Sequence, residues 1–154
     1  MKSNKIALAA ILLWVITVAV FAWFFIRGNT VAGSDNRTAV VLGVGERELV
    51  LSEMRGLLGG VHGILGGINR GNLKQVASAA RAVGMASAAD VNPALMAKLP
   101  MPFKQLGMSV HQDMDDLAQA AESGKPAADL QTMLTNTLSK CVACHASWQL
   151  KAGS

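Results

Sequence analysis

The sequence predicts an all-α protein in which an N-terminal transmembrane helix precedes an antiparallel four-helix bundle. Three observations lead to this fold class. Residues 6–26 are apolar almost without interruption, four later segments repeat apolar residues at helical spacing, and short segments rich in glycine, asparagine or proline separate those four. We therefore expect a membrane anchor over residues 1–27, a linker over residues 28–45 and the helical domain over residues 46–154.

The apolar run from Ile6 to Ile26 has the length of a membrane-spanning helix. About 20 residues cross a bilayer as a helix, whereas the apolar core of a secretory signal has only about 7–15 residues. An uncleaved single-pass anchor is the expectation that follows from this length. The alternative is a cleaved signal peptide, because Val31 and Gly33 form a small-residue pattern in front of Ser34.

The charge of the chain argues against a nucleic-acid-binding protein. The chain has 14 basic and 10 acidic residues and a net charge of +4. Lys2, Lys5 and Arg27 flank the apolar run, which leaves 11 basic against 10 acidic residues from residue 28 onwards. Since no basic stripe is visible in this remainder, we expect no nucleic-acid partner.

The first two helices of the domain are expected from about Glu46 to Ile68 and from about Leu73 to Met85. Asn72 is a suitable N-cap for the second of them. The segment from Ala39 to Leu42 is too short and isolated to predict a strand, so we expect it to lead into the first helix. The apolar residues of that helix recur at spacings of three and four and so share one face: Val50, Met54, Leu57, Val61, Leu65 and Ile68.

The last two helices follow an apolar connector that runs from Asn92 to Pro102 and contains three prolines. The third helix is expected from Pro102 or Phe103 to about Glu122, since proline suits a first helical turn. Gly124 and Pro126 then break the chain. The fourth helix is expected from about Ala127 to Leu150. Four amphipathic helices with short connections favour an antiparallel bundle.

Residues 141–145 read Cys-Val-Ala-Cys-His, which is the attachment motif of a c-type haem. Each thiol can add to a haem vinyl group to form a thioether, and the imidazole can bind the iron. Residues three and four apart on a helix share a face, so Cys141, Cys144 and His145 would all point towards one flat ligand. The sequence thus predicts one covalently bound haem c with His145 as an iron ligand.

Two other chemistries use a pair of cysteines at this spacing. A structural zinc site needs four ligands, and the chain has only these two cysteines, with His62 and His111 too isolated to form a paired ligand set. A redox-active dithiol of the thioredoxin type lies near a βαβ unit, and the sequence shows no such unit. Haem attachment is therefore the favoured interpretation.

With this motif on the last of four helices, the domain resembles the cytochrome c prime family from roughly Glu46 to Lys151. Cys141, Cys144 and His145 match the family's attachment motif residue by residue, and Lys151 is similar to a basic residue often found beyond it. The resemblance implies a four-helix bundle. Covalent haem implies an exported domain, on the periplasmic side of a bacterial inner membrane. A membrane anchor is a departure from the usual soluble form.

The resemblance also implies which residues cover the second face of the haem. In this family, an arginine on the first helix lies four residues before the side chain that covers that face. Arg47 and Leu51 have this spacing, and leucine cannot bind iron, as in five-coordinate members. Met54 lies about one turn further on the same face and could supply its sulfur as a second iron ligand, as in low-spin members. Met96 and Met101 in the connector are looser candidates.

The first helix of the domain contains six glycines, although each costs up to about 1 kcal/mol in a helix relative to alanine. Two explanations are open. The glycines allow close packing of two helices, or they make room for one face of the haem. The six are Gly56, Gly59, Gly60, Gly63, Gly66 and Gly67.

Electron transfer is the function that these observations favour, because the anchor would keep a redox-active haem near membrane oxidoreductases. The expected partners are membrane or periplasmic redox proteins, and the sequence is compatible with a homodimer. One alternative is the binding or sensing of a diatomic gas at an open haem face. A structural or metal-binding bundle without haem is another. No acid–base pair or nucleophile arrangement stands out, so we do not expect an enzyme.

Overall fold

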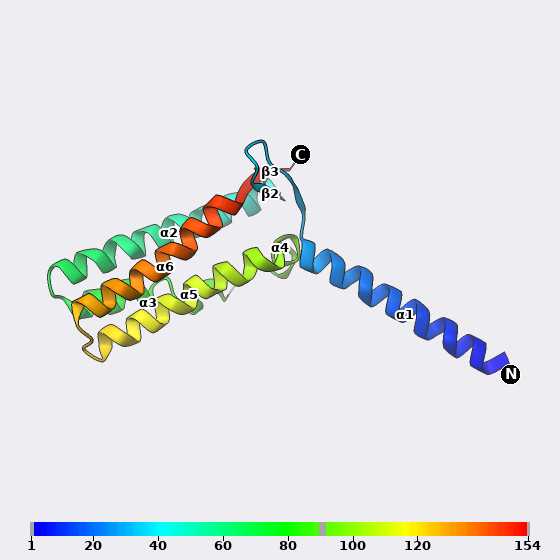
Figure 1. Cartoon of the computed structure of the whole chain (residues 1–154), viewed down its shortest axis with the longest axis horizontal. Helices are drawn as coiled ribbons and strands as arrows, with labels where there is room; N and C mark the ends of the chain where they lie inside the picture. Colours follow the sequence, from blue (N-terminus) through cyan, green and yellow to red (C-terminus); the bar gives the residue numbers. More distant parts are fainter. Residues whose placement is uncertain (1, 90–91, 154) are drawn as a thin grey trace.

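The computed structural model describes residues 2–89 and 92–153, and 76% of these residues are helical. The predicted helices therefore dominate, but three short strands join them (Figure 1). The elements in chain order are α1 (Lys2–Arg27), β1 (Thr30–Ala32), β2 (Thr38–Leu42), α2 (Val44–Asn69), α3 (Leu73–Arg81), the 3-10 turn η1 (Met85–Ala88), α4 (Pro93–Lys98), α5 (Met101–Glu122), α6 (Ala127–Ser147) and β3 (Trp148–Ala152).

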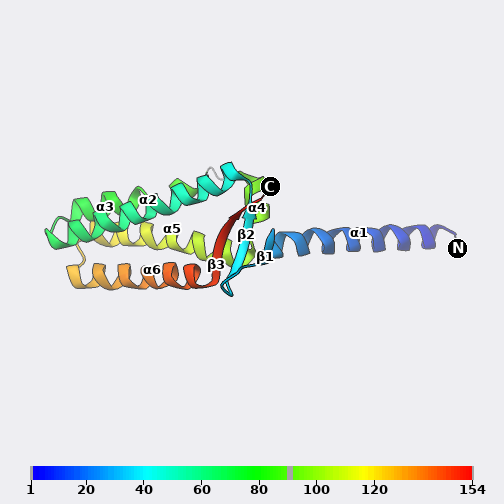
Figure 2. The same ribbon diagram turned by 90° about the horizontal axis from the view of Figure 1, so that it is seen from above.

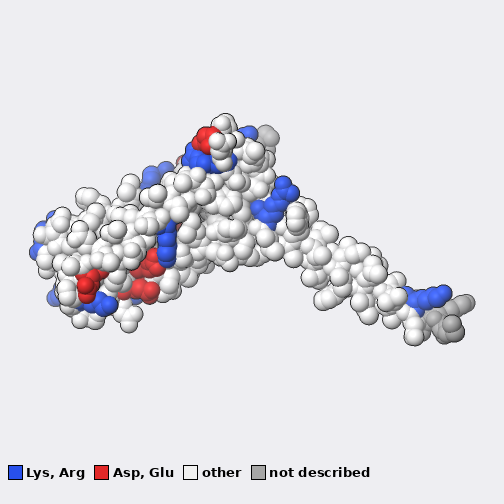
Figure 3. All heavy atoms as spheres, in the orientation of Figure 1, with Lys and Arg blue, Asp and Glu red and all other residues white. Residues whose placement is uncertain are grey.

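α1 projects away from the rest of the molecule in both ribbon views (Figures 1 and 2). An 18-residue stretch of its segment Asn4–Arg27 has a mean hydropathy of 2.6, and the segment is long and apolar enough to cross a membrane. The visible face of α1 carries charged side chains only at its two ends (Figure 3). An N-terminal apolar helix is thus confirmed, and its length and composition suit either an anchor or a signal sequence.

The C-terminal end of α1 is fixed to the helical domain rather than joined by a free tether. The backbone N–H of Asn29 donates to the carbonyl of Lys98 at 2.7 Å. Gly28, at φ +65°, leaves no room for a Cβ, which would lie 2.5 Å from that same carbonyl oxygen. The Nζ of buried Lys104 donates to the carbonyl of Phe25 at 3.0 Å and lies 3.5 Å from the centre of its ring.

The long helices α2, α5 and α6 and the shorter α3 extend from the sheet in the direction opposite to α1 (Figure 2). α3 packs between α2 and α5, and α6 contacts both α2 and α5. The apolar stripes seen in the sequence meet in the core between these helices, because burial removes their surface from water. The fully buried members of this core are Ile64, Val76, Ala80, Met114, Leu117, Ala118, Leu130 and Leu134.

A three-stranded sheet corrects the expectation of an all-α protein. β2 lies in its centre, antiparallel to β1 and parallel to β3. Val40 and Leu42 of β2 are 0% and 1% exposed and belong to a second apolar core with α2, α4 and α5. The segment from Ala39 to Leu42, expected to lead into a helix, therefore lies entirely in β2. Its β-branched residues suit a strand once a partner is present.

The end of α6 differs from the prediction for the same reason. The helix ends at Ser147, and Trp148 adopts the extended values φ −127° and ψ 149°. Trp148 to Ala152 pair with Thr38 to Leu42 instead of continuing the helix to Leu150. The Trp148 ring packs edge-on against Phe103, with ring centres 6.0 Å apart.

The remaining boundaries agree with the sequence except between α3 and α5. α3 ends at Arg81 rather than Met85, because the Asp115 carboxylate accepts a hydrogen bond from the Met85 N–H at 2.9 Å and draws the chain into η1. The connector predicted before Pro102 contains the short helix α4. Asn72 caps α3 as expected, since its side chain accepts from the Gln75 N–H at 3.1 Å.

Candidate functional site

The three residues of the C-x-x-C-H motif lie in the last turns of α6. Cys141 and Cys144 are free and half-buried, while His145 is more exposed. Burial raises the pKa of both thiols, so each is held in its protonated form. The spacing of three and four residues brings the three side chains to the same side of α6, which faces α2 and α5.

Two cavities adjoin the motif, and we call them the larger and the smaller motif cavity. Their volumes are about 180 Å³ and about 100 Å³. Both are lined by Met54 of α2, Phe103 of α5, and Cys144 and His145 of α6. Cys141 lines the smaller cavity. The motif thus lies beside a hollow whose opposite wall comes from the N-terminal half of α2.

The structure brings the residues proposed from the first helix to this same place. Arg47, Leu51 and Met54 all line the larger motif cavity, and Met54 also lines the smaller one. Met96 and Met101, the looser candidates, line neither of the two. The glycines of α2 also line neither motif cavity.

Close helix packing explains several of those glycines instead. A Cβ at Gly60 would lie 2.6 Å from a methyl group of Val83, and one at Gly67 would lie 2.7 Å from a methyl group of Val76. A Cβ at Gly63 would lie 2.8 Å from the Cβ of Ala79. Glycine at these positions lets α2 approach α3 and the turn after it more closely than any other residue would.

Arg37 is a site residue that the sequence analysis did not find. It lines the larger motif cavity, and its guanidinium donates to the carbonyl of His145 at 3.2 Å. Asp35 holds the guanidinium at 2.6 Å, and this partner lowers the pKa of the Asp35 carboxyl. A cation at the C-terminus of α6 also complements the helix dipole. No local pattern signals this role, because Arg37 and His145 meet only through the pairing of β2 with β3.

Phe103 and Trp148 form an aromatic wall that was also missed. Both line the larger motif cavity and touch one another edge-on. The position of Trp148 depends on β3, which pairs with β2, so helical spacing alone does not predict it. These rings lie beside the motif on the side of the sheet.

The chain gives no match when compared with protein-family models, with curated proteins or with solved structures.

The donor atoms around the motif cavities are two thiols, one imidazole and one thioether sulfur. Imidazole and thioether are axial ligands of haem iron, and thiols are the groups that attach a c-type haem. The described residues contain no group of three or more His, Cys, Asp or Glu side chains that could hold a metal ion. The chemistry of this donor set is that of a haem c site.

The two other histidines lie outside this donor set. His62 is exposed on α2. His111 is buried in α5, where its two ring nitrogens contact the Val83 carbonyl at 2.9 Å and the Glu53 carboxylate at 3.1 Å. His111 borders the smaller motif cavity, but both of its nitrogens already have partners.

Proposed function

We propose that this chain is a membrane-anchored c-type cytochrome of the cytochrome c prime type, an electron carrier rather than an enzyme. One observation carries the proposal: Cys141, Cys144 and His145 share one side of α6 and adjoin a hollow that Met54 lines from α2. The two cysteines would hold haem c by thioether bonds, and His145 would bind its iron. The bound haem would supply a one-electron change at the iron.

The protein's own residues would set the environment of that iron. Met54, which lines both motif cavities, would supply its sulfur as a second iron ligand, and Leu51 would lie beside it over the bound haem. Phe103 and Trp148 would exclude water from one side. Arg37, through the His145 carbonyl, would fix the orientation of the last turn of α6 and hence of the imidazole. Ligand identity, burial and hydrogen bonding are the levers by which a protein tunes a haem.

The arrangement of the helices supports the bundle that this family would require. α2, α3, α5 and α6 contact one another in a closed order, and short turns connect α2 to α3 and α5 to α6. The N-terminal half of α2 lies beside the C-terminal end of α6 through the motif cavities. We propose that these four helices form an antiparallel bundle with the haem at its sheet end.

We further propose that α1 is retained as an anchor and that the domain lies in the periplasm of a bacterium. Cleavage in front of Ser34 would remove β1, which pairs with β2, and Asn29, which bonds to Lys98. It would also deprive the buried amine of Lys104 of the Phe25 carbonyl. An anchored carrier would exchange electrons with membrane or periplasmic redox proteins.

Binding of a diatomic gas is the second candidate function. It is favoured by the presence of Leu51, which has no donor atom for iron, on the same cavity wall as Met54. If Met54 does not bind the iron, a small ligand could approach under Leu51. The two candidates therefore differ in the coordination of one face of the haem.

The test of haem attachment is extraction with acid acetone after denaturation. Haem should stay with the wild-type chain and should extract freely from the Cys141→Ala, Cys144→Ala double variant. Val142→Ala is the matched control, since Val142 lies inside the motif but is exposed and should not affect retention. Free extraction from the wild type, or retention by the double variant, would refute the proposal.

A further inference from the structure

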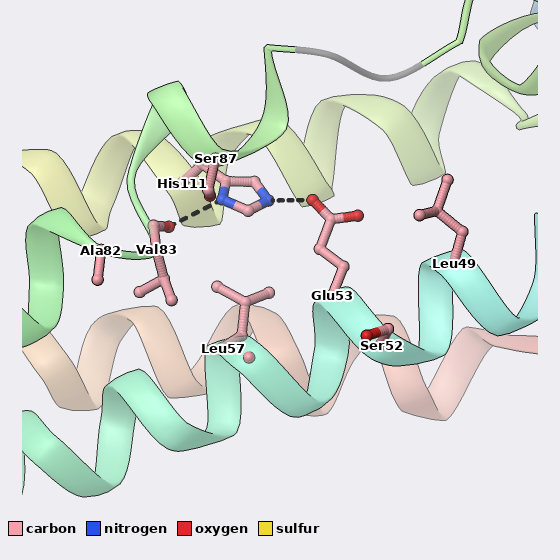
Figure 4. Close-up of a pocket in the computed structure, with 9 residues that line it drawn as sticks. Leu49, Ser52, Glu53, Leu57, Ala82, Val83, Ser87 and His111 are labelled. Atoms are coloured by element: carbon pink, nitrogen blue, oxygen red, sulfur yellow. Dashed lines mark hydrogen bonds and ion pairs between the residues drawn. The ribbon is translucent and has the colours of Figure 1, made fainter.

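A separate cavity of about 350 Å³ opens between α2, the end of α3, η1 and α5 (Figure 4). We call it the Glu53 cavity. Its volume is in the range of small-molecule sites. Its lining is mostly apolar, with four polar side chains among nine residues: Leu49, Ser52, Glu53, Gly56, Leu57, Ala82, Val83, Ser87 and His111.

His111 holds Glu53 in place at the edge of this cavity. Its Nδ1 lies 2.9 Å from the Val83 carbonyl oxygen and its Nε2 3.1 Å from one oxygen of the Glu53 carboxylate. Glu53 raises the pKa of His111, so the protonated ring that donates at both nitrogens is favoured. His111 therefore acts as a positioning residue and has no donor left for a ligand.

Two of the polar groups that remain for a ligand, on Glu53 and Ser87, are acceptors, and the hydroxyl of Ser52 can donate or accept. The second Glu53 oxygen points away from His111 (Figure 4), and the structure gives it no hydrogen-bond partner among the described residues. The Ser87 hydroxyl donates to the Gly84 carbonyl at 2.7 Å, which leaves the Ser87 oxygen as an acceptor. A ligand with hydroxyl donors on an apolar ring would satisfy these acceptors and the apolar walls formed by Leu49 and Leu57.

Gly56 keeps part of this cavity free of side chains. A Cβ at Gly56 would have no heavy atom within 4 Å, unlike Gly60 and Gly67, which pack closely on their neighbours. Packing therefore does not require glycine here, although it costs the helix about 1 kcal/mol relative to alanine. A larger side chain at Gly56 would enter open space on the cavity side of α2.

The position of the Glu53 cavity relates it both to the membrane end of the domain and to the motif. It shares Leu49, Glu53 and His111 with a cavity under α4. That second cavity is also lined by Lys104, which bonds to the last turn of α1. The Glu53 cavity shares Glu53, Leu57 and His111 with the smaller motif cavity as well. One carboxylate–histidine pair thus borders all three spaces.

We propose that the Glu53 cavity binds the ring of a lipid-soluble hydroquinone, with one phenolic hydroxyl donating to the free Glu53 oxygen. The role of this ligand as an electron donor rests on the proposed cytochrome function, whereas its binding does not. A hydroquinone that becomes a quinone releases two electrons and two protons. One molecule would therefore reduce two copies of a one-electron carrier and release both protons to water.

The test is equilibrium binding of decylubiquinol to the full chain in detergent. Dithionite keeps both protein and ligand reduced, so that no electron transfer accompanies binding. Gly56→Leu should fill the cavity and raise the Kd at least tenfold. The matched control is Gly59→Leu, because Gly59 also has open space around its Cβ but does not line the cavity. Both leucines should favour the helix, so a loss of binding would not reflect unfolding.

Glu53→Gln tests the proposed hydrogen bond. It replaces the free acceptor by an amide that can turn its donor towards the ligand, so the Kd should rise roughly tenfold. Glu122→Gln, which alters an exposed carboxylate paired with Arg81, should leave the Kd unchanged. No binding to the wild type, or equal Kd values for Gly56→Leu and Gly59→Leu, would overturn the proposal.

The two proposals of function and of ligand can fail separately. A chain that retains covalent haem but does not bind decylubiquinol would refute the hydroquinone site alone. A chain without haem that binds decylubiquinol in a Gly56-dependent and Glu53-dependent manner would refute the cytochrome and support the binding site.

Discussion

Replacing Leu42 with alanine should destabilise the domain by about 3 kcal/mol. Leu42 is 1% exposed and lies in the apolar core beneath the sheet. The substitution removes three carbon atoms, worth about 0.8 kcal/mol each. Incomplete collapse of the resulting cavity adds a further cost, and buried Leu→Ala changes generally lie at about 2–5 kcal/mol. For a domain of this size, the expected loss corresponds to a fall in Tm of roughly 10 °C.

The assay is urea and thermal unfolding in detergent, followed by circular dichroism at the helical minimum. Leu58→Ala is the matched control, because Leu58 is a leucine of α2 that is 70% exposed. That change should alter the free energy of unfolding by no more than about 0.5 kcal/mol.

The same core includes partly buried Met54, Cys144 and Trp148, so Leu42→Ala should also disturb the motif cavities. If Leu42→Ala costs less than about 1 kcal/mol in global unfolding, the sheet is not part of the cooperative unit. β2 and β3 would then not shape the site.

Three further outcomes are expected. If Met54 binds the iron, the ferric spectrum should show a sulfur-to-iron charge-transfer band in the near-red. The Met54→Leu variant should lose this band and bind carbon monoxide quickly. A wild-type protein that is high-spin and binds carbon monoxide at once would favour gas binding instead. Residues 6–26 should keep the chain in the membrane fraction at high salt, and recovery of a soluble form starting near Ser34 would contradict an anchor. Lys98 and the Gly43 N–H lower the pKa of Glu46 below its ordinary value of 4.5. The stability that Glu46 contributes is therefore present above pH 4.5 and is lost as the pH falls through the lower folded-state pKa. Glu46→Gln should reduce this loss of stability at acid pH, measured as the free energy of urea unfolding at pH 3 to 7. An unchanged loss of stability would show that the ion pair does not contribute.

The sequence alone located the long helices and the apolar N-terminal segment, because both depend on local periodicity and composition. The predicted starts of α2, α3, α5 and α6 agree with the structure to within two residues. The resemblance to the cytochrome c prime family singled out Arg47 and Leu51, and Met54 on the same helix face, and this helix adjoins Cys144 and His145. Helical spacing is a local property, so a pattern of three and four residues is sufficient to predict a shared face.

Tertiary structure decided what depends on residues far apart in the chain. Thr38 and Trp148 pair in the sheet, and Arg37 reaches the carbonyl of His145, although more than 100 residues separate each pair. The short strand β2 has no stability by itself, and the end of α6 has no local stop signal, so neither could be predicted before the two met. The Glu53–His111 pair has the same origin: two helices must pack before a carboxylate and an imidazole can hold one another.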